Sequence, residues 1–373
     1  MKFEIEFLAV GSSSRPGDAI IVRYGDPSAY DLMVVDGGTT ETGETMVAHL
    51  KEQFGDHVWL RHVALTHSDA DHASGLRVLL RDIPVVNLWL HIPWNHAAES
   101  RSLFADKSFT DDTLREAIRQ EYDIISDICD LAVAKGCNIL YAFAGAVIGP
   151  FQVLSPSRYA YVHLLPQFDK TPEPDRDELQ ARSMWLGKMQ RASLFSSLFE
   201  SLTAKLQNWV NETWAYERLR DGGVTSTSNE SSLVLCGDFG ECGRALLTGD
   251  AGFQALSWAA SYAESIGIPL RDFAIVQIPH HGSRRNVGPT ILNRLIGDIR
   301  PVGSLPHFAA FVSAPANEDT HPRRMVTNAF IRRGARVIAT QGANALHRCG
   351  YRPRAGYVSA DSYLFATTVE EYD

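Results

Sequence analysis

The order of apolar and polar residues along this chain predicts strands that alternate with helices. The first 80 residues read as three strands, a helix, a fourth strand and a loop. We expect the strands at 3–7, 19–22, 32–35 and 63–65, and the helix at 46–54. A further strand is expected at 85–92, followed by helical sequence over 111–135.

The second half of the chain returns to strands after a helical stretch. Apolar runs predict strands at 232–235, 245–247, 274–278, 309–313 and 336–340, and a helix at 323–333. Strands, then helices, then strands and helices again indicate two packed sheets with helices outside. We therefore expect an α/β fold in a single domain that spans residues 1–373.

Residues 175–220 stand apart from this pattern. Apolar residues recur every four positions from Leu194 to Trp214, which predicts a long helix or a helical hairpin with one apolar stripe. The proline-containing stretch 170–175 and the glycines at 222–223 are natural breaks on either side. Two interpretations stay open at this stage. The stripe docks on the core, or it forms a lid or a dimer surface.

The composition is that of a well-packed globular protein, with 45% hydrophobic and 21% charged residues. Its longest apolar stretches, such as 143–148, are too short to cross a bilayer. The net charge of −9 argues against tight, sequence-independent binding of long nucleic acid, because phosphate neutralisation dominates that affinity. Five cysteines, an odd number without a Cys-x-x-Cys pair, predict reduced thiols in a cytoplasmic protein.

Residues suited to metal chemistry follow four of the predicted strands. The densest group is the segment 66–72, Thr-His-Ser-Asp-Ala-Asp-His, directly after the strand at 63–65. Two imidazoles and two carboxylates in so short a stretch can hold two divalent cations. The other strand ends carry Asp36, Asp250 and the pair His280 and His281. Four strand ends that converge would place one site on rigid support.

Three motifs together resemble the metallo-β-lactamase superfamily. They are His-x-Asp-x-Asp-His at 67–72, Leu-Leu-Thr-Gly-Asp at 246–250 and His-His-Gly-Ser at 280–283. Within that superfamily the chain is most similar to the hydrolase domain of ComEC-type DNA-uptake proteins, and more distantly to phosphorylcholine esterases. The resemblance covers residues 1–80, 145–157 and 228–345. It implies an αββα sandwich with a helical insertion, and a two-metal hydrolytic site at one edge of the two sheets.

The same resemblance implies a set of metal ligands. His67 and Asp69 would hold the first divalent ion, and Asp250 would bridge to the second. The second ion would be held by Asp71, His72 and His281. The resemblance favours His281 because superfamily members usually place the last ligand directly before a glycine.

Other residues are expected to act around these ligands. Asp71 is a candidate catalytic residue as well as a ligand, and His280 is a candidate for contacting a phosphoryl oxygen or protonating a leaving group. Asp36 is expected to orient a ligand such as His67 through a hydrogen bond. His321 lies in a Thr-His-Pro turn before a predicted helix, and we expect it to contact the substrate or leaving group. Its alternative role is a helix-cap histidine.

The sequence departs from the usual superfamily pattern at the first metal position. Asp69 replaces the second histidine, and no clear third-motif histidine follows; His91, His96 and His163 are candidates outside a Gly-His context. One half of the site is therefore poorer in imidazole and richer in oxygen. That composition favours Mn²⁺ or mixed occupancy in this half over two tight Zn²⁺ ions. The cofactors expected are two divalent ions, zinc or manganese.

Arginine pairs next to two of the motifs favour a phosphoester as substrate. Arg284-Arg285 follows the His-His-Gly-Ser motif and Arg323-Arg324 follows Pro322. The guanidinium fork suits phosphate oxygens. The residues expected to bind the substrate are Ser283, Arg284 and Asn317.

We therefore expect a phosphodiesterase or nuclease in which a hydroxide shared by two metal ions attacks the phosphorus. Its substrate would be a phosphoester, such as short or single-stranded nucleic acid or a nucleotide, with no membrane partner. A homodimer through the helical insertion is a further alternative. A phosphomonoester or carboxylic-ester hydrolase, and a weakly active sensor or interaction module, are the competing functions.

Overall fold

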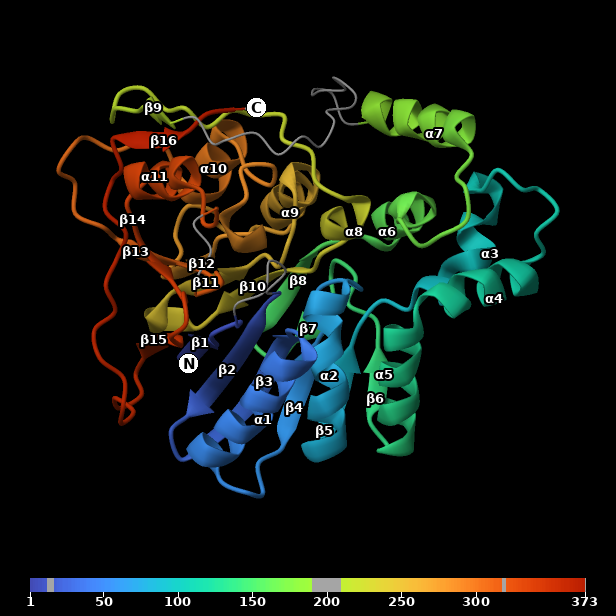
Figure 1. Ribbon diagram of the computed structural model, residues 1–373, viewed down its shortest axis with the longest axis horizontal. Coiled ribbons are helices and arrows are strands. Elements are labelled where there is room, and N and C mark those ends of the chain that lie inside the picture. The colour runs from blue at the N-terminus through green and yellow to red at the C-terminus, as the bar shows by residue number, and fades with distance from the viewer. Residues whose placement is uncertain (12–16, 190–208, 317–319, 373) are drawn as a thin grey trace.

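Two seven-stranded sheets pack face to face, with helices on both outer faces (Figure 1). The computed structural model describes residues 1–11, 17–189, 209–316 and 320–372. The layer order is helix, sheet, sheet, helix, so the predicted αββα sandwich is confirmed. One apolar cluster fills the space between the sheets, and one lies between each sheet and its helices.

The first sheet contains the N-terminal strands in the order β15-β1-β2-β3-β4-β5-β6. Their bounds are β1 Lys2–Phe7, β2 Ala19–Asp26, β3 Ala29–Gly37, β4 Leu60–Ala64, β5 Val85–Trp89, β6 Asn138–Leu140 and β15 Ala345–Cys349. Strands β3 to β6 run parallel. Their carboxyl ends therefore share one edge of the sheet, which is where Asp36 and residues 66–72 lie.

The second sheet has the order β14-β13-β12-β11-β10-β8-β7. Its strands are β7 Val147–Ile148, β8 Phe151–Ser155, β10 Val234–Asp238, β11 Arg244–Leu247, β12 Ile275–Gln277, β13 Phe308–Val312 and β14 Ala335–Ala339. Strands β11 to β14 are parallel. Asp250 and the two adjacent histidines follow β11 and β12, at the carboxyl edge of this sheet.

Seven of the described helices cover the two outer faces. On the first sheet these are α1 Thr40–Phe54, α2 Ala70–Asp82, α4 Asp111–Glu121 and α5 Asp123–Ala134; on the second they are α9 Phe253–Ser265, α10 Pro289–Ile296 and α11 Arg324–Arg332 (Figure 1). The helical sequence predicted over 111–135 forms two helices that meet at Tyr122. The short helices are α3 Ala97–Ser100, α6 Arg158–Leu164 and α8 Thr227–Glu230.

Helix α2 corrects the prediction of a loop after the fourth strand. It begins at Ala70, directly after Asp69, and buries Leu76, Leu79 and Leu80 against the first sheet. Those leucines have helical spacing, but the density of polar residues in 66–72 favoured a loop. Asp71 and His72 therefore lie in the first turn of a helix.

The close packing of α2 depends on a glycine without a side chain. A Cβ on Gly75 would lie 1.9 Å from the main-chain oxygen of Gly37 and 2.8 Å from that of Thr39. Gly75 N also donates to Gly38 O at 3.0 Å. This approach holds the start of α2 beside the end of β3, and so brings His72 to Asp36.

The segment 175–220 is helical only in part. Helix α7 spans Arg176–Met189, but Trp209–Asn211 is strand β9 and pairs with β16, Thr368–Glu370, near the C-terminus. The prediction of helix as far as Trp214 is therefore wrong at this end, because pairing with the C-terminal segment replaces it. Glu212 is buried in an ion pair with Arg332 of α11, which anchors the segment. The stripe from Leu194 to Leu206 lies outside the described residues, so the lid and the dimer surface stay predictions.

One disulfide contradicts the expectation of five reduced thiols. Cys242 and Cys349 are bonded, with their Cα atoms 5.7 Å apart. Cys242 lies between β10 and β11, and Cys349 ends β15, so the bond joins the two sheets. The sequence separation of 107 residues hid this pairing. Cys129, Cys137 and Cys236 are free.

Within the described part of the chain, no helix combines the length and apolarity needed to cross a membrane.

Candidate metal centre

The candidate ligands predicted from four strand ends come together where the carboxyl edges of the two sheets meet. Four groups of side chains have ligand atoms that all lie within 4.8 Å of one another. They are His67, His72 and Asp250; Asp71, His72 and His281; Asp250, His280 and His281; and Asp18, Asp36 and His72. His72 belongs to three of these groups, and Asp250 and His281 to two each, so these three residues lie at the centre of the cluster.

Asp36 orients two of the histidines. Its carboxylate accepts hydrogen bonds from Thr66 N at 2.7 Å, Thr66 Oγ1 at 2.6 Å and His72 Nδ1 at 2.7 Å. Because the Thr66 hydroxyl donates to Asp36, it accepts from His67 Nδ1 at 3.0 Å. In their neutral forms both imidazoles therefore carry hydrogen on Nδ1 and present the lone pair of Nε2. The expected contact to His67 thus runs through Thr66, and the direct contact is to His72.

The atoms that point into the centre have no hydrogen-bond partner. His67 Nε2, His72 Nε2 and Asp250 Oδ1 are buried and unpartnered. His72 Nε2 lies 3.4 Å and His67 Nε2 3.9 Å from Asp250 Oδ2. Buried polar atoms are rarely left without partners. Convergent lone pairs of imidazole and carboxylate are what a divalent cation requires, so these residues fit a bound metal ion.

The pKa values show how strongly these groups act on one another. Burial alone would lower the pKa of His72, but the carboxylates of Asp250 and Asp36 outweigh it and hold that pKa well above its usual value. Burial opposes the charged form of Asp250 as well, yet His280 and His72 hold its pKa well below the usual range. The centre therefore keeps its carboxylate charged and draws positive charge towards it.

His280 and His281 reach the centre from the second sheet. Both residues have positive φ, 48° and 55°, a conformation that costs free energy in non-glycine residues. His281 Nδ1 donates to Ser313 O at 3.0 Å, which leaves its Nε2 lone pair free. His280 Nε2 lies 3.7 Å from Asp250 Oδ2. Both histidines are thus in position to be ligands, whereas the resemblance favoured His281 alone.

Asp69 lies on the open side of the centre. Its side chain is 41% exposed, and its Oδ2 is 3.6 Å from His67 Nε2. Ser228 donates a hydrogen bond to the other oxygen of Asp69. Burial of the carboxyl raises its pKa, but His67 and the Ser228 bond outweigh burial and lower it. Asp69 is therefore a charged group next to His67 that solvent or a substrate can reach.

The predicted substrate-binding residues have other partners. Ser283 Oγ accepts from Arg285 N at 3.2 Å. Arg284 Nη1 donates to Glu371 O at 2.7 Å, and its guanidinium lies 4.8 Å from the Tyr372 ring centroid. The Arg284 guanidinium is thus held by the C-terminal segment. Arg285 is exposed. Asn317 lies outside the described residues.

His321 lies close to the His280–Gly282 turn. Its neighbour Pro322 packs on that turn, since a Cβ on Gly282 would lie 2.6 Å from Pro322 Cβ. Arg323 N donates to Gly282 O at 3.2 Å. The Nδ1 atom of the His321 ring lies 3.1 Å from Thr320 Oγ1. This position is compatible with the predicted contact to a substrate.

The three candidates for a third-motif histidine belong to none of the four ligand groups found among the described residues. His91 is buried between the rings of Phe143 and Tyr161, whose centroids lie 4.4 and 4.5 Å from its own. Burial lowers the pKa of His91 to about 3. Its imidazole is therefore a neutral member of an aromatic cluster beside the centre.

Four further residues hold the centre through hydrogen bonds, and no sequence motif indicated their roles. They are Thr66, Ser228, Asn286 and Ser313.

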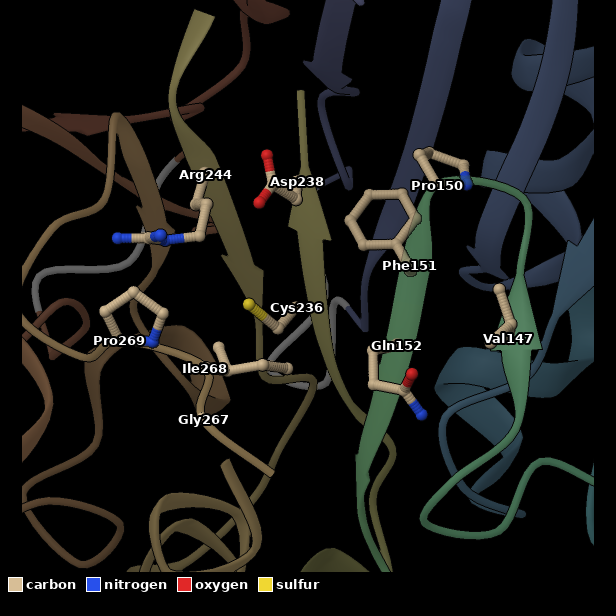
Figure 2. A pocket seen from close by; sticks show the side chains of 10 residues that line it. All are labelled: Val147, Pro150, Phe151, Gln152, Cys236, Asp238, Arg244, Gly267, Ile268 and Pro269. Atoms are coloured by element: carbon tan, nitrogen blue, oxygen red, sulfur yellow. The ribbon is translucent and has the colours of Figure 1, made fainter. Parts of the chain in front are cut away.

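A hollow of about 260 Å³ lies away from these ligands (Figure 2). Phe151 and Gln152 of β8 line one side and Arg244 of β11 another, with Cys236 of β10 between them. Arg244 is paired with Asp272 at 2.7 Å. None of its lining residues belongs to the ligand groups, so the hollow is separate from the candidate metal centre.

No protein-family model matches this sequence, and no curated protein matches it significantly. Similarity to solved structures is weak. Unliganded yeast PDE1 shares 13% identity over 91% of this chain and 97% of its own, with a TM-score of 0.41. The metallo-β-lactamase SMB-1 shares 11% identity over 75% of this chain and 82% of its own, with a TM-score of 0.29.

A metallo-β-lactamase superfamily protein of Sulfolobus tokodaii shares 12% identity over 78% of this chain and 84% of its own, with a TM-score of 0.27. At this level the similarities carry no functional argument. The assignment of the αββα fold therefore rests on the topology of this chain. Its fold and site define an αββα protein with a candidate metal centre where the edges of the two sheets meet.

Proposed function

We propose that this chain is a metal-dependent hydrolase of phosphoesters, a phosphodiesterase or nuclease of the metallo-β-lactamase superfamily. The observation that carries the proposal is the convergence of unpartnered Nε2 atoms of His67 and His72 on the buried carboxylate of Asp250. Without a metal ion, only protons on the imidazoles can satisfy the carboxylate, which is why the pKa of His72 is raised; a divalent cation would take the place of those protons.

Two groups of residues would hold two divalent ions. His67 and Asp69 would hold one ion and Asp71, His72 and His281 the other, with Asp250 between them. His280, which lies with His281 and Asp250 in one ligand group, would be a further ligand. When bound, such ions polarise a phosphoryl oxygen and lower the pKa of a coordinated water towards neutrality. Exposed Asp69 adds an oxygen ligand to the first group, which supports Mn²⁺ or a mixture with Zn²⁺ there.

The chain's own residues would then fix the ligands and orient the substrate. Asp36 and Thr66 keep the ligand rings fixed from behind, and the exposed side of the centre, next to Asp69 and Ser228, admits the substrate. His321 lies beside the ligand turn and would contact the leaving group. Exposed Arg285 supplies positive charge near that turn.

Several features of the substrate remain proposals. The motifs resemble those of the ComEC-type hydrolase domain, which supports a DNA, RNA or nucleotide phosphodiester. The net charge of −9 supports short or single-stranded substrates over long duplexes. We also propose that the protein is cytoplasmic and that it forms a homodimer through the helical segment.

The test is metal titration followed by hydrolysis assays with Mn²⁺ and Zn²⁺. Substrates are a single-stranded oligonucleotide, a cyclic nucleotide, bis-p-nitrophenyl phosphate and a p-nitrophenyl carboxylic ester. We expect metal-dependent cleavage of a phosphodiester, and its loss together with bound metal in Asp250→Asn. Asp238→Asn, an exposed acid in the second sheet, is the matched control. Cleavage of the carboxylic ester alone would refute the phosphoester proposal, and failure to bind either metal would refute the metal centre.

A further inference from the structure

Asn286 connects the two loops that carry Asp250 and His280. The residue is completely buried. Its Nδ2 donates to Asp250 O at 2.8 Å and lies 3.4 Å from Ala251 O. Its Oδ1 lies 3.0 Å from Nδ1 of His280. One amide therefore contacts both loops of the second sheet that contribute to the candidate centre.

The orientation of the Asn286 amide follows from these partners. Main-chain carbonyl oxygens only accept hydrogen bonds, so the amide nitrogen must face Asp250 and Ala251. A reversed amide would set its oxygen against two carbonyl oxygens. The oxygen of Asn286 must therefore face His280, and a hydrogen bond forms there only when Nδ1 of His280 carries the hydrogen.

A second amide, that of Asn229, approaches the same ring nitrogen but does not oppose this conclusion. Its Nδ2 lies 3.0 Å from His280 Nδ1 and 2.8 Å from Thr225 Oγ1. A hydroxyl can donate or accept, so the Asn229 amide can turn over and present its oxygen to His280 while keeping its bond to Thr225. Asn286 has no such freedom, and it decides which nitrogen is protonated.

We propose that Asn286 is a positioning residue that holds neutral His280 with its hydrogen on Nδ1, and so directs the Nε2 lone pair towards Asp250. His280 Nε2 and Asp250 Oδ2, 3.7 Å apart, are then both acceptors, and a cation between them satisfies both. In this tautomer Nε2 has no hydrogen to give to a leaving group. The use of His280 as a ligand rests on the proposed function, whereas the tautomer does not.

The tautomer can be read directly by NMR. Long-range proton–nitrogen correlation on metal-free protein with ¹⁵N-labelled histidine distinguishes the two forms at a pH of about 8, where ordinary imidazoles are neutral. The His280 signals are assigned by their loss in His280→Gln. We expect hydrogen on Nδ1 in the wild type. Asn286→Leu should shift the ring towards the Nε2–H form. Hydrogen on Nε2 in the wild type would overturn the inference.

Metal titration supplies a second measurement. Asn286→Leu should weaken binding of one ion by about 10- to 100-fold, as is typical when a residue behind a metal ligand is lost. The matched control is Asn328→Leu, because Asn328 is equally buried and joins α11 to Glu212 and Ala366 far along the chain. Equal losses in both folded variants would overturn the inference. If the wild type binds metal but cleaves no phosphoester, only the proposed function fails. Should Asn286→Leu not fold, the wild-type spectrum still decides.

Discussion

Among single residues, Asp36 has the largest expected influence on the centre without being a predicted ligand. It is fully buried, has a φ of 58°, and accepts from both Thr66 and His72. Its position at the end of β3 is visible in the sequence. Its effect on His67 through the Thr66 hydroxyl is a property of the three-dimensional arrangement.

Asp36→Asn should weaken metal binding while the fold is retained. An amide in this position offers one acceptor oxygen in place of two and turns an N–H towards donors, so His72 and Thr66 lose alignment. We expect a loss of about 10- to 100-fold in affinity, measured by calorimetric titration. Asp31→Asn, on the same strand but in a half-exposed ion pair with Arg61, is the control and should bind metal as the wild type does. Unchanged affinity in Asp36→Asn would contradict the orienting role.

Glu230 should make the stability of the protein depend on pH. Burial raises the pKa of its carboxyl to about 7 from an ordinary value of 4.5, although the carboxyl accepts from Ala255 N at 2.7 Å. Between these two values the native state keeps a proton that the unfolded chain has lost. Stability therefore falls as pH rises through this window, by up to about 3 kcal/mol for this group, because one pKa unit corresponds to about 1.4 kcal/mol.

The measurement is the free energy of unfolding in urea across that pH window. Glu230→Gln should flatten the decline, because its amide does not titrate. Glu264→Gln, an exposed position on α9, the helix whose first turn donates to Glu230, should leave the slope unchanged. An identical slope in wild type and Glu230→Gln would show that this carboxyl does not contribute.

Among the elements, α2 shows what the sequence could and could not predict. The order of the strands and the polar residues at their ends could be predicted, because apolar runs and motifs are local features of the sequence. The helix itself was missed, since Asp69, Asp71 and His72 hide its apolar periodicity. The bonds that His281 donates to Ser313 O and that Asn286 donates to Asp250 O could not be predicted, because they join residues 32 and 36 positions apart in the sequence. Four strand ends were predicted to converge, those followed by Asp36, by residues 66–72, by Asp250 and by the pair His280 and His281, and residues from all four lie in the ligand groups.

Gly75→Ala should disturb this element and the centre together. The new Cβ would lie 1.9 Å from the main-chain oxygen of Gly37, so the backbone of α2 must move away from β3. We expect a loss of stability of about 1–3 kcal/mol in urea unfolding, and weaker metal binding because His72 moves with the helix. Ser74→Ala, one residue earlier in α2, is the control and should change neither quantity by much.

For the whole molecule, the two sheets must be held in a fixed position relative to one another, because each supplies ligands to the candidate centre. At one edge the candidate ligands from both sheets would be joined through bound ions. Elsewhere the disulfide from Cys242 to Cys349 connects the second sheet to the first, and the N-terminal amine donates to Phe239 O at 2.8 Å. Movement of one sheet against the other would break the ligand set, so these connections support the geometry of the centre.

Thiol counting and unfolding experiments test the disulfide. In denaturant without reductant we expect three reactive thiols, those of Cys129, Cys137 and Cys236, and five after reduction. Reduction, or the paired substitution Cys242→Ser and Cys349→Ser, should lower the free energy of unfolding by up to about 4–5 kcal/mol, because the closed loop spans a sequence separation of 107 residues. Cys137→Ser, a free thiol, is the control for sulfur loss. Five thiols before reduction would show that the pair is not bonded. Disulfides are rare in the cytosol, so the same count in protein purified from cells tests the cytoplasmic prediction.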